Sequence, residues 1–307
     1  MKVIKCIIFS LVILAIGCTK DPVVINNQDT LGETTLKGFN MRWRNTPKLS
    51  EKLFTYVDSL KPDLMRYPGG TMAHKWNWKE GVASPSNSND IVHKIENVKL
   101  FADGVNSNII FVLDVVNSTL ENQLEMLQQA NVPVKYIELG NELYSDHYET
   151  EFPNGKAYAD TVNAWTPTLR AHFPNAKIGA VMLGRNAGND RKANWNTNVY
   201  NNILAEVDAF IYHIYVTETE TVQERVERFL PTFIENTGKE LWITEYGAHS
   251  HNLNQLNELA NYIESIADVA LSHCLISGSG NFSKITPEIE YTPEGLEYLK
   301  RNNPLVN

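Results

Sequence analysis

Short apolar runs alternate with longer amphipathic stretches along most of this chain. The short runs are rich in valine, isoleucine and aromatic residues, and they cover Leu36–Met41, Asp63–Arg66, Asn108–Asp114, Val134–Leu139, Lys177–Met182, Val207–Tyr215, Glu240–Glu245 and His273–Ser277. Between them, apolar residues recur at the helical period over Leu49–Leu60, Ile91–Asp103, Leu120–Ala130, Ala157–His172, Thr197–Ala205, Thr221–Asn236 and Leu253–Leu271. This alternation is typical of repeated strand–helix units around a parallel sheet.

Eight such units favour a closed barrel over an open sheet. Roughly 250 residues over eight units gives about 31 residues for each unit of a (β/α)8 barrel. A doubly wound sheet usually carries a glycine-rich phosphate loop after its first strand, and residues 38–42 contain no G-x-G-x-x-G motif. We therefore predict the α/β class, with a single (β/α)8 TIM barrel over residues 35–307. Its active site should lie at the C-terminal ends of the strands.

Composition and charge exclude several classes of function. The chain has 27 Lys and Arg residues against 36 Asp and Glu residues, a formal net charge of -9, which argues against nucleic-acid binding. The pair His249 and His251 has no third spaced ligand, and no H-E-x-x-H or G-x-S-x-G motif occurs. We predict no metal and no cofactor.

The first 17 residues have the features of a secretion signal. Lys2 and Lys5 precede an apolar run over residues 7–16, which is shorter than the about 20 residues needed to span a bilayer. The sequence Leu-Ala-Ile-Gly-Cys at 14–18 resembles a bacterial lipobox, which implies lipidation of Cys18. An ordinary signal with an incidental cysteine is the alternative. Residues 18–34 are polar and are expected to form a tether.

The predicted lipoprotein would contact the membrane through its acyl chains only. Removal of the signal takes away Lys2 and Lys5 and leaves 25 basic against 36 acidic residues, a net charge of -11. The anionic headgroups of a membrane do not attract a protein of this charge. The expected location is the cell envelope, at the outer membrane in a Gram-negative host. Cys274 would be the lone remaining cysteine, so the mature chain can form no internal disulfide and Cys274 is expected in the core.

Two glutamates end the fourth and seventh runs. Glu142 follows the sequence Glu-Leu-Gly-Asn, and Glu245 lies in Thr-Glu-Tyr, 103 residues later. Strands four and seven stand on roughly opposite walls of a barrel, where inward carboxylates can approach to about 5 Å, as in retaining glycosidases. One carboxylate can then attack the anomeric carbon while the other serves as acid and base. The alternative is two rim glutamates in ordinary salt bridges.

These two motifs resemble those of clan A glycoside hydrolases, nearest to families 39, 51 and 79. The resemblance implies that Glu142 is the general acid/base and Glu245 the nucleophile. It also implies that Asn141 donates a hydrogen bond to the sugar 2-hydroxyl. Glu138 shares strand parity with Glu142 and is interpreted as a buried structural partner.

Two further strand ends resemble the same clan. Arg66 opens an Arg-x-Pro-Gly-Gly segment and is expected to keep Glu245 ionised, although it could instead pair with a structural acid. His213 and Tyr215 form a His-x-Tyr pair on one face of the sixth strand, where the tyrosine would contact the nucleophile and the histidine would line the site. A satisfied core histidine is the alternative for His213.

Substrate contacts are also expected from Asn40 and Arg42, at the end of the first strand, and from aromatic side chains. Trp76 and Trp78 follow the Pro-Gly-Gly turn in a polar loop, and Trp195 is a further candidate, while structural packing is the alternative for all three.

The chain departs from the clan in two ways. Many members place a tryptophan at the end of strand eight, where residues 277–282 are expected here. Families 39, 51 and 79 also usually append a β-sandwich domain. Here about 30 residues follow the eighth strand, which leaves room for a final helix only, so we expect a smaller member of the clan without that domain.

The sequence therefore predicts a lipid-anchored retaining glycoside hydrolase that acts outside the cytoplasm on a polysaccharide or oligosaccharide. A surface glycan-binding protein that has lost catalysis is the first alternative, and a lyase or transglycosylase is the second. The sequence indicates a carbohydrate as the partner and no particular protein partner. It leaves the sugar, the linkage and the oligomeric state open.

Overall fold

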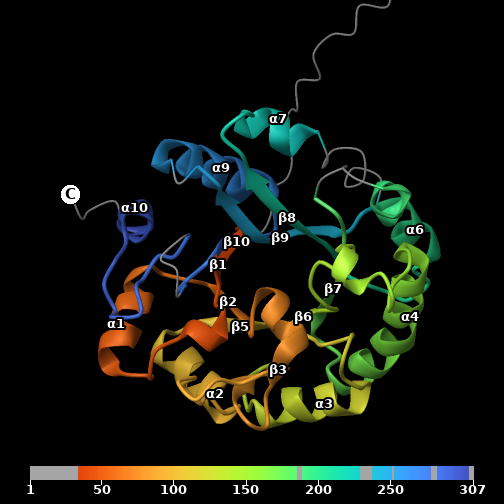
Figure 1. Cartoon of the computed structure of the whole chain (residues 1–307), viewed down its shortest axis with the longest axis horizontal. Helices are drawn as coiled ribbons and strands as arrows, with labels where there is room; N and C mark the ends of the chain where they lie inside the picture. Colours follow the sequence, from red (N-terminus) through yellow and green to blue (C-terminus); the bar gives the residue numbers. More distant parts are fainter. Residues whose placement is uncertain (1–33, 185–188, 229–236, 251, 278–281, 304–307) are drawn as a thin grey trace, which may run out of the picture. The chain divides into compact units, whose positions relative to one another are not determined.

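The computed structural model shows a closed barrel of parallel strands surrounded by helices (Figure 1). It describes residues 34–184, 189–228, 237–250, 252–277 and 282–303. The predicted signal, Cys18 and nearly all of the predicted tether lie outside these residues. The predicted single TIM barrel is confirmed.

Eight short strands form the barrel, and all of them run parallel. They are β1 (Leu36–Asn40), β2 (Leu64–Tyr67), β5 (Asn108–Val112), β6 (Tyr136–Glu138), β7 (Lys177–Val181), β8 (Ala209–Val216), β9 (Glu240–Ala248) and β10 (Val269–His273). Each strand pairs with the next in this order, and β10 pairs with β1 to close the barrel. Because all strands point the same way, their C-terminal ends meet at one end of the barrel.

Helices follow the strands and cover the outside of the barrel. They are α1 (Glu51–Ser59), α2 (Glu96–Gly104), α3 (Leu120–Gln129), α4 (Gly155–His172), α5 (Asp190–Ala193), α6 (Trp195–Asn202), α7 (Val222–Glu227), α9 (Leu253–Ile266) and α10 (Pro293–Asn302). Several begin at a side chain that accepts a backbone N–H, such as Ser50, Asn154 and Thr292. Within the described residues, none of the helices has the length and hydropathy needed to cross a membrane.

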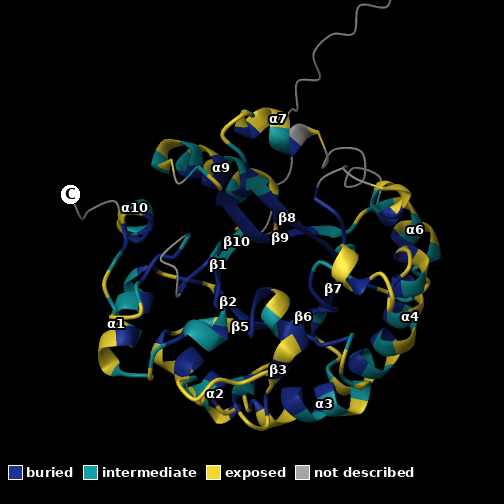
Figure 2. Ribbon diagram, viewed as in Figure 1, coloured by how far each residue is buried: buried dark blue, intermediate teal, exposed yellow. Residues whose placement is uncertain are grey.

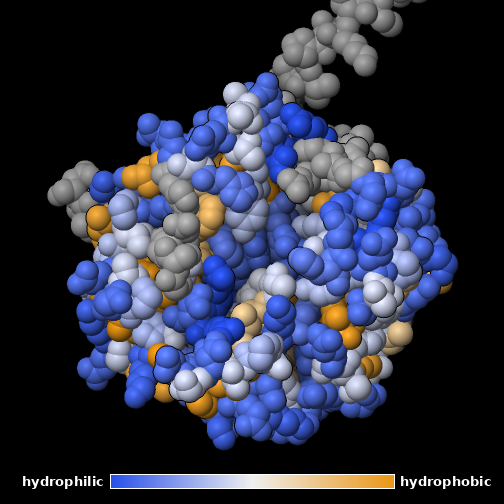
Figure 3. All heavy atoms as spheres, viewed as in Figure 1, coloured by the Kyte–Doolittle hydropathy of each residue, from blue (hydrophilic) through white to orange (hydrophobic). Residues whose placement is uncertain are grey.

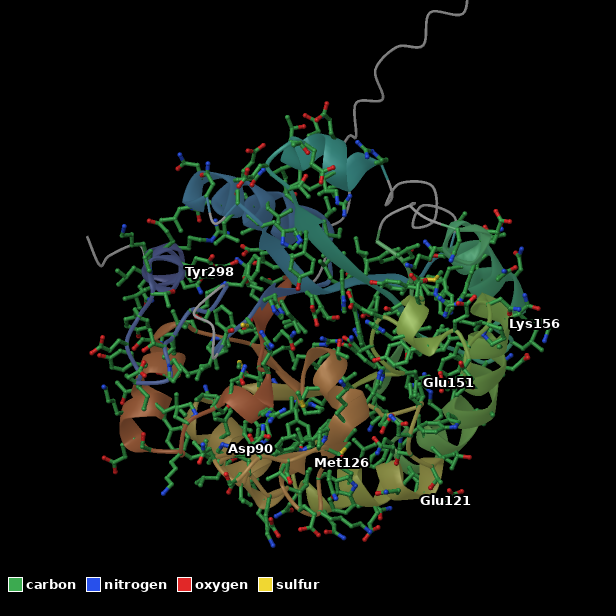
Figure 4. All side chains as sticks on the ribbon, in the orientation of Figure 1. Asp90, Glu121, Met126, Glu151, Lys156 and Tyr298 are labelled. Carbon is green, nitrogen blue, oxygen red and sulfur yellow. The ribbon has the colours of Figure 1, made fainter. Side chains whose placement is uncertain are left out.

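The helices bury one face against the barrel and expose the other. Figure 2 shows buried strands in the centre and exposed positions on the outer sides of the helices. The labelled side chains of Glu121 on α3 and Lys156 on α4 lie at the outer edge (Figure 4). Tyr298 of α10 is buried, and its hydroxyl donates a hydrogen bond of 2.7 Å to the Tyr246 hydroxyl of β9. This amphipathic pattern is the signal from which the helices were predicted.

A small apolar cluster is formed by residues of the barrel strands themselves. Its buried members are Leu64, Ile110, Ala209, Ile211, Trp242, Val269 and Leu271. Because side chains alternate along a strand, the residues two positions further on share this face. On β2, β8 and β10 these residues are Arg66, His213 and His273. The apolar layer therefore supports a polar layer at the C-terminal end.

The eighth strand is not where the sequence predicted it. Strand β10 covers Val269–His273 rather than 273–277, and helix α9 ends at Ile266 rather than at residue 271. Residues 274–276 are apolar because they pack in the core after the strand has ended, and Ile276 forms a bridge to Ile285. Cys274 is fully buried as predicted, and burial raises the pKa of its thiol to about 11.

Candidate active site

An irregularity in β9 points Glu245 into the barrel. Tyr212 of β8 pairs with Ile243, but the next residue, His213, pairs with Glu245, so Thr244 is an extra residue in β9. Regular alternation from the inward Trp242 would place Thr244 inside and Glu245 outside. A β-bulge of this kind redirects a side chain, as is common next to active sites.

Three donors hold the Glu245 carboxylate. Its Oε1 accepts hydrogen bonds from Arg66 Nη1 at 2.6 Å and from Asn40 Nδ2 at 2.8 Å, and its Oε2 accepts one from the Tyr215 hydroxyl at 2.7 Å. Burial alone would raise the pKa of Glu245, but the charges of His213, His273 and Arg66 and the Tyr215 hydrogen bond hold that pKa well below its ordinary value. Glu245 is therefore ionised at neutral pH.

Arg66 connects Glu245 to a buried structural acid. Its Nε and Nη2 atoms donate to Glu138 at 2.9 and 2.8 Å, and Nη2 also donates to Asn141 Oδ1 at 2.8 Å. Arg66 and Glu138 are fully buried. Both roles considered for Arg66, pairing with the predicted nucleophile and with a structural acid, are thus present. The predicted structural role of Glu138 is confirmed.

Glu142 reaches the same site from a loop and not from a strand. Strand β6 ends at Glu138, so strand parity does not determine the direction of Glu142, contrary to our prediction. Instead, Gly140 with φ 92° and Glu142 with φ 46° turn the chain back toward the barrel. The side chain of Glu142 is 33% exposed, compared with 7% for Glu245. Glu142 is therefore the more accessible of the two carboxylates.

His213 lies between the two glutamates. Its Nδ1 is 3.0 Å from Glu142 Oε1 and 3.8 Å from Glu245 Oε2. Burial would lower the pKa of His213, but the two carboxylates outweigh burial and raise it. Contacts with both carboxylates distinguish His213 from an ordinary core histidine. Its predicted contact with substrate stays a prediction.

Each of the two glutamates and His213 offers one atom that could ligate a metal, and these three atoms lie within 4.8 Å of one another, a spacing that a divalent ion could use. However, Arg66 Nη1 already contacts Glu245 Oε1, and its positive charge opposes a second cation there. The arrangement is better suited to carboxylate chemistry than to metal binding.

His74 positions the loop that carries Glu142, and the sequence analysis missed it. It is buried in η2 (Gly70–Lys75), and its Nε2 accepts the Asn141 backbone N–H at 3.1 Å. Its Nδ1 is 2.8 Å from the Tyr148 hydroxyl. An acceptor at Nε2 requires the neutral ring with its proton on Nδ1. Burial, assisted by Arg66, lowers the pKa of His74 to about 3.

We expect His74→Gln to weaken the dependence of stability on acid pH. The folded protein keeps His74 neutral down to about pH 3, whereas the unfolded chain takes up a proton near 6.5. Protonation therefore favours the unfolded chain, and the free energy of unfolding falls as pH drops from 6.5 toward 3. His213 acts in the opposite direction because its pKa is raised. Thermal unfolding followed by circular dichroism between pH 7 and pH 4 measures the slope.

The variant His172→Gln is the control, since His172 is exposed on α4 and hydrated in both states. It should keep the wild-type slope. A His74→Gln slope equal to that of the wild type would show that His74 is not held neutral.

His273 is a second site residue that sequence analysis missed. It ends β10, where the clan often has tryptophan, and its Nδ1 is 3.5 Å from Glu245 Oε2 and 3.0 Å from Asn40 Nδ2. Burial is the main cause that lowers its pKa to about 4. The correct end of the strand would have revealed it. Residues 277–282, expected at this place, follow the strand, and 278–281 lie outside the described residues.

Asn40 is fully buried, and its Nδ2 contacts Glu245 and His273, so it holds the carboxylate in place. Asn141 is also buried, and Arg66 engages its Oδ1, which leaves Nδ2 available as a donor. This orientation is compatible with the predicted contact to a sugar hydroxyl.

Two cavities meet at Glu142 and Tyr215. One of about 340 Å³ is lined by both glutamates, and the other of about 280 Å³ is lined by Glu142 but not by Glu245. Figure 3 shows a hollow with mostly hydrophilic walls near the centre of the face of the molecule that is in view. The two cavities provide space on either side of Glu142.

The three tryptophans considered as substrate contacts do not line the cavity at Glu245. Trp76 and Trp78 are largely buried and line a third cavity of about 590 Å³, which shares Lys75 with the cavity at Glu245. Their substrate contact stays a prediction. Trp195 is fully buried and stacks on Tyr158, so it packs in the interior, the alternative considered above.

Solved structures of glycosidases share this fold. An α-L-arabinofuranosidase from Thermotoga maritima matches with a TM-score of 0.63 and 15% identity over 86% of this chain and 69% of that chain. The family 51 α-L-arabinofuranosidase AbfB from Bifidobacterium longum matches with a TM-score of 0.65 and 13% identity over 87% and 71%. A family 128 endo-β-1,3-glucanase from Amycolatopsis mediterranei matches with a TM-score of 0.54 and 11% identity over 87% and 99%.

This chain thus spans about two thirds of the arabinofuranosidase chains. At these identities the likeness shows the fold alone. No curated protein matches the sequence significantly.

A family model supplies the assignment that these distant structures do not. The model described as glycosyl hydrolase catalytic core matches residues 55–303. This range includes both glutamates, Arg66 and seven of the eight barrel strands. The chain therefore belongs to the glycosyl hydrolase catalytic core family.

Proposed function

We propose that the protein is a retaining glycoside hydrolase in which Glu245 is the nucleophile and Glu142 is the general acid/base. The family and the glycosidase folds of the structural neighbours support a glycoside hydrolase. The observation that carries the retaining mechanism is the approach of the two carboxylates, with oxygen atoms within 4.8 Å. Retaining enzymes have carboxyl groups about 5 to 5.5 Å apart, and inverting enzymes about 6.5 to 9.5 Å.

The surroundings of the carboxylates support this assignment of roles. Glu245 is buried and ionised, so it can attack the anomeric carbon. Glu142 is partly exposed and borders both cavities, so it can reach a leaving-group oxygen and later a water molecule.

The proposed reaction has two steps. In the first, Glu245 forms a bond to the anomeric carbon while the glycosidic C–O bond breaks, and Glu142 gives its proton to the departing oxygen. In the second, ionised Glu142 takes a proton from water, whose oxygen displaces Glu245 from the anomeric carbon. Two inversions give a product of retained configuration. Glu142 thus becomes negatively charged in the first step and neutral again in the second, while His213 lies 3.0 Å from Glu142 and 3.8 Å from Glu245.

The stereochemistry of the product tests this proposal. The protein should release reducing ends from at least one member of a panel of polysaccharides and aryl glycosides. Proton NMR of the first-formed sugar should then show the anomer of the substrate. The opposite anomer would exclude double displacement. Binding without released reducing ends, unchanged in Glu245→Ala, would favour a surface glycan-binding protein, and an unsaturated or transferred sugar would indicate a lyase or transglycosylase.

We also propose that the substrate is met outside the cytoplasm, with the protein anchored at the cell envelope through lipidated Cys18. The support is the charged start, the short apolar run and the lipobox-like Leu-Ala-Ile-Gly-Cys at residues 14–18. Expression with labelled palmitate should label the wild type but not Cys18→Ala, and the variant should leave the membrane fraction. Equal membrane association of both would contradict the proposal.

The printed substrates of the neighbours, α-L-arabinofuranosides and β-1,3-glucan, differ from each other, although their folds are similar. We therefore propose no particular sugar from them, because specificity lies in the loops grafted on the barrel.

A further inference from the structure

We infer that the sugar unit bound beside Glu245 carries an anionic group, a carboxylate or a sulfate ester, which Arg42 and Lys75 hold. This inference rests on the proposed function, since it assumes that the cavity at Glu245 receives the glycosyl unit. That cavity, of about 340 Å³, is lined by Glu142 and Glu245 and also by Arg42 and Lys75. Two cations thus share a small reaction pocket with the two carboxylates.

The carboxylates deep in the site already have basic partners. The Arg66 guanidinium contacts Glu138 at 2.8 Å and Glu245 at 2.6 Å, and His213 contacts Glu142 at 3.0 Å. Each of these three glutamates therefore already has a basic side chain within 3.0 Å. Arg42 and Lys75 are therefore not needed to compensate the glutamates.

Neither cation has an acidic partner among the described residues. The Arg42 side chain makes a long hydrogen bond of 3.4 Å from Nη1 to Ser277 Oγ and also contacts the Cys274 thiol, neither of which is an acidic group, although a guanidinium has five donors. Lys75 is exposed at the end of η2, and no carboxylate of the described chain lies within 4.0 Å of its Nζ.

Nearby lysines show the contrast. Lys79 contacts Glu125 at 2.7 Å, and Lys192 contacts Asp146 at 2.7 Å. The chain as a whole has a net charge of -9, so acidic partners are abundant. The cavity at Glu245 thus brings together two cations that have no acidic partner within the described part of the chain, and an anionic ligand would pair them.

The backbone of Arg42 is also held in an uncommon conformation. Its φ and ψ are 50° and 62°, the left-handed region, just before η1 (Trp43–Asn45). This conformation is unfavourable for a residue with a side chain, and such positions cluster at ligand sites. A planar guanidinium matches the paired oxygens of a carboxylate or sulfate, and the Lys75 ammonium adds a second positive charge.

Lys75 also lines the neighbouring cavity of about 590 Å³. It therefore lies where the reaction pocket adjoins the larger one. An acidic polysaccharide, with charges on successive sugars, could use both cavities.

Binding of non-reactive sugars tests the inference without requiring turnover. The probes are glucuronic and galacturonic acids, glucose and galactose 6-sulfates, and the matching neutral sugars, with Kd measured by calorimetry or ligand-observed NMR. We expect at least one acidic sugar to bind about tenfold or more tightly than its neutral counterpart, since a hydrogen bond to a charged group is typically worth this much. The carboxylate and sulfate arms identify the anionic group.

Variants then show which side chains cause the tighter binding of acidic sugars. Lys75→Gln and Arg42→Gln should each remove most of it, whereas Lys156→Gln, paired with Asp160 on α4 away from both cavities, should leave it unchanged. Because Lys75 is exposed, Lys75→Gln remains informative even where Arg42→Gln fails to fold. A panel in which no acidic sugar binds more tightly than its neutral counterpart overturns the inference. A preference that survives Lys75→Gln in full overturns it as well.

The outcome is distinguishable from failure of the proposed function. A binding preference without hydrolysis would reject the hydrolase and keep the anionic site. Hydrolysis of neutral glycans with no preference for acidic sugars would keep the hydrolase and reject the anionic site.

Discussion

Replacement of Glu245 with glutamine is expected to reduce turnover by about ten-thousand-fold or more and to leave the protein folded. Glutamine has nearly the same shape, and its amide oxygen can still accept the hydrogen bonds of Arg66 and Asn40. It cannot form the glycosyl ester that the retaining mechanism requires. The ratio kcat/KM on the substrate found by the glycan panel measures the loss.

A matched control lies on the same strand. Glu240 begins β9 at the opposite end of the barrel and pairs with Lys177 at 2.5 Å. Glu240→Gln should keep kcat/KM within about twofold, because it touches no substrate.

Azide adds a test of mechanism. With Glu245→Ala, azide can occupy the place of the missing carboxylate and should give a glycosyl azide of inverted configuration. Retention of more than a tenth of wild-type activity by Glu245→Gln would remove Glu245 from the role of nucleophile.

Replacement of Arg66 with methionine is expected to destabilise the protein by about 3 to 5 kcal/mol and to abolish most activity. The substitution leaves Glu138 and Glu245 buried without their shared cation. Loss of that cation also removes one of the charges that keep Glu245 ionised. Denaturant unfolding measures the free energy, and kcat/KM measures the activity.

Two further variants test whether the stability loss comes from the buried carboxylates that Arg66→Met leaves unpaired. Arg44→Met breaks a partly exposed pair with Asp90 at 3.1 Å and should cost about 1 kcal/mol or less. The double variant Arg66→Met/Glu138→Gln should recover part of the lost stability, because one buried charge has been removed. It should recover no activity. A stability loss for Arg66→Met no larger than that for Arg44→Met would contradict the proposed network.

The barrel was predictable because its signal is repeated. Each βα unit shows a short apolar run followed by a helical period, so an error in one unit leaves the count unchanged. Strand eight illustrates this, since it was placed four residues too late and the barrel prediction still held. The run Val-Ala-Leu-Ser at 269–272 fits a helix as well as a strand, and periodicity alone cannot separate the two over so few residues.

The site was only partly predictable. Motifs after four strands identified Glu142, Glu245, Arg66, His213 and Tyr215, and the barrel brings all five together. His74 and His273 were missed, because neither belongs to a motif and their contacts cross more than 25 residues of sequence.

For Arg42, the sequence indicated a contact with substrate but not the kind of group that it would hold. Its lack of an acidic partner in the described chain, and with it the inferred anionic ligand, became visible only when the pocket was assembled.

The sequence by itself determined the eightfold repeat and the residues that carry chemistry, because hydrophobic period and local motifs are properties of neighbouring positions. The tertiary structure decided the directions of the two glutamates. Glu245 faces inward only because β9 gains a residue at Thr244, and Glu142 does so only because its backbone turns at φ 46°. Both distortions persist through contacts with distant segments, such as the hydrogen bond from the Asn141 N–H to His74. Such contacts exist only after the strands have closed into the barrel.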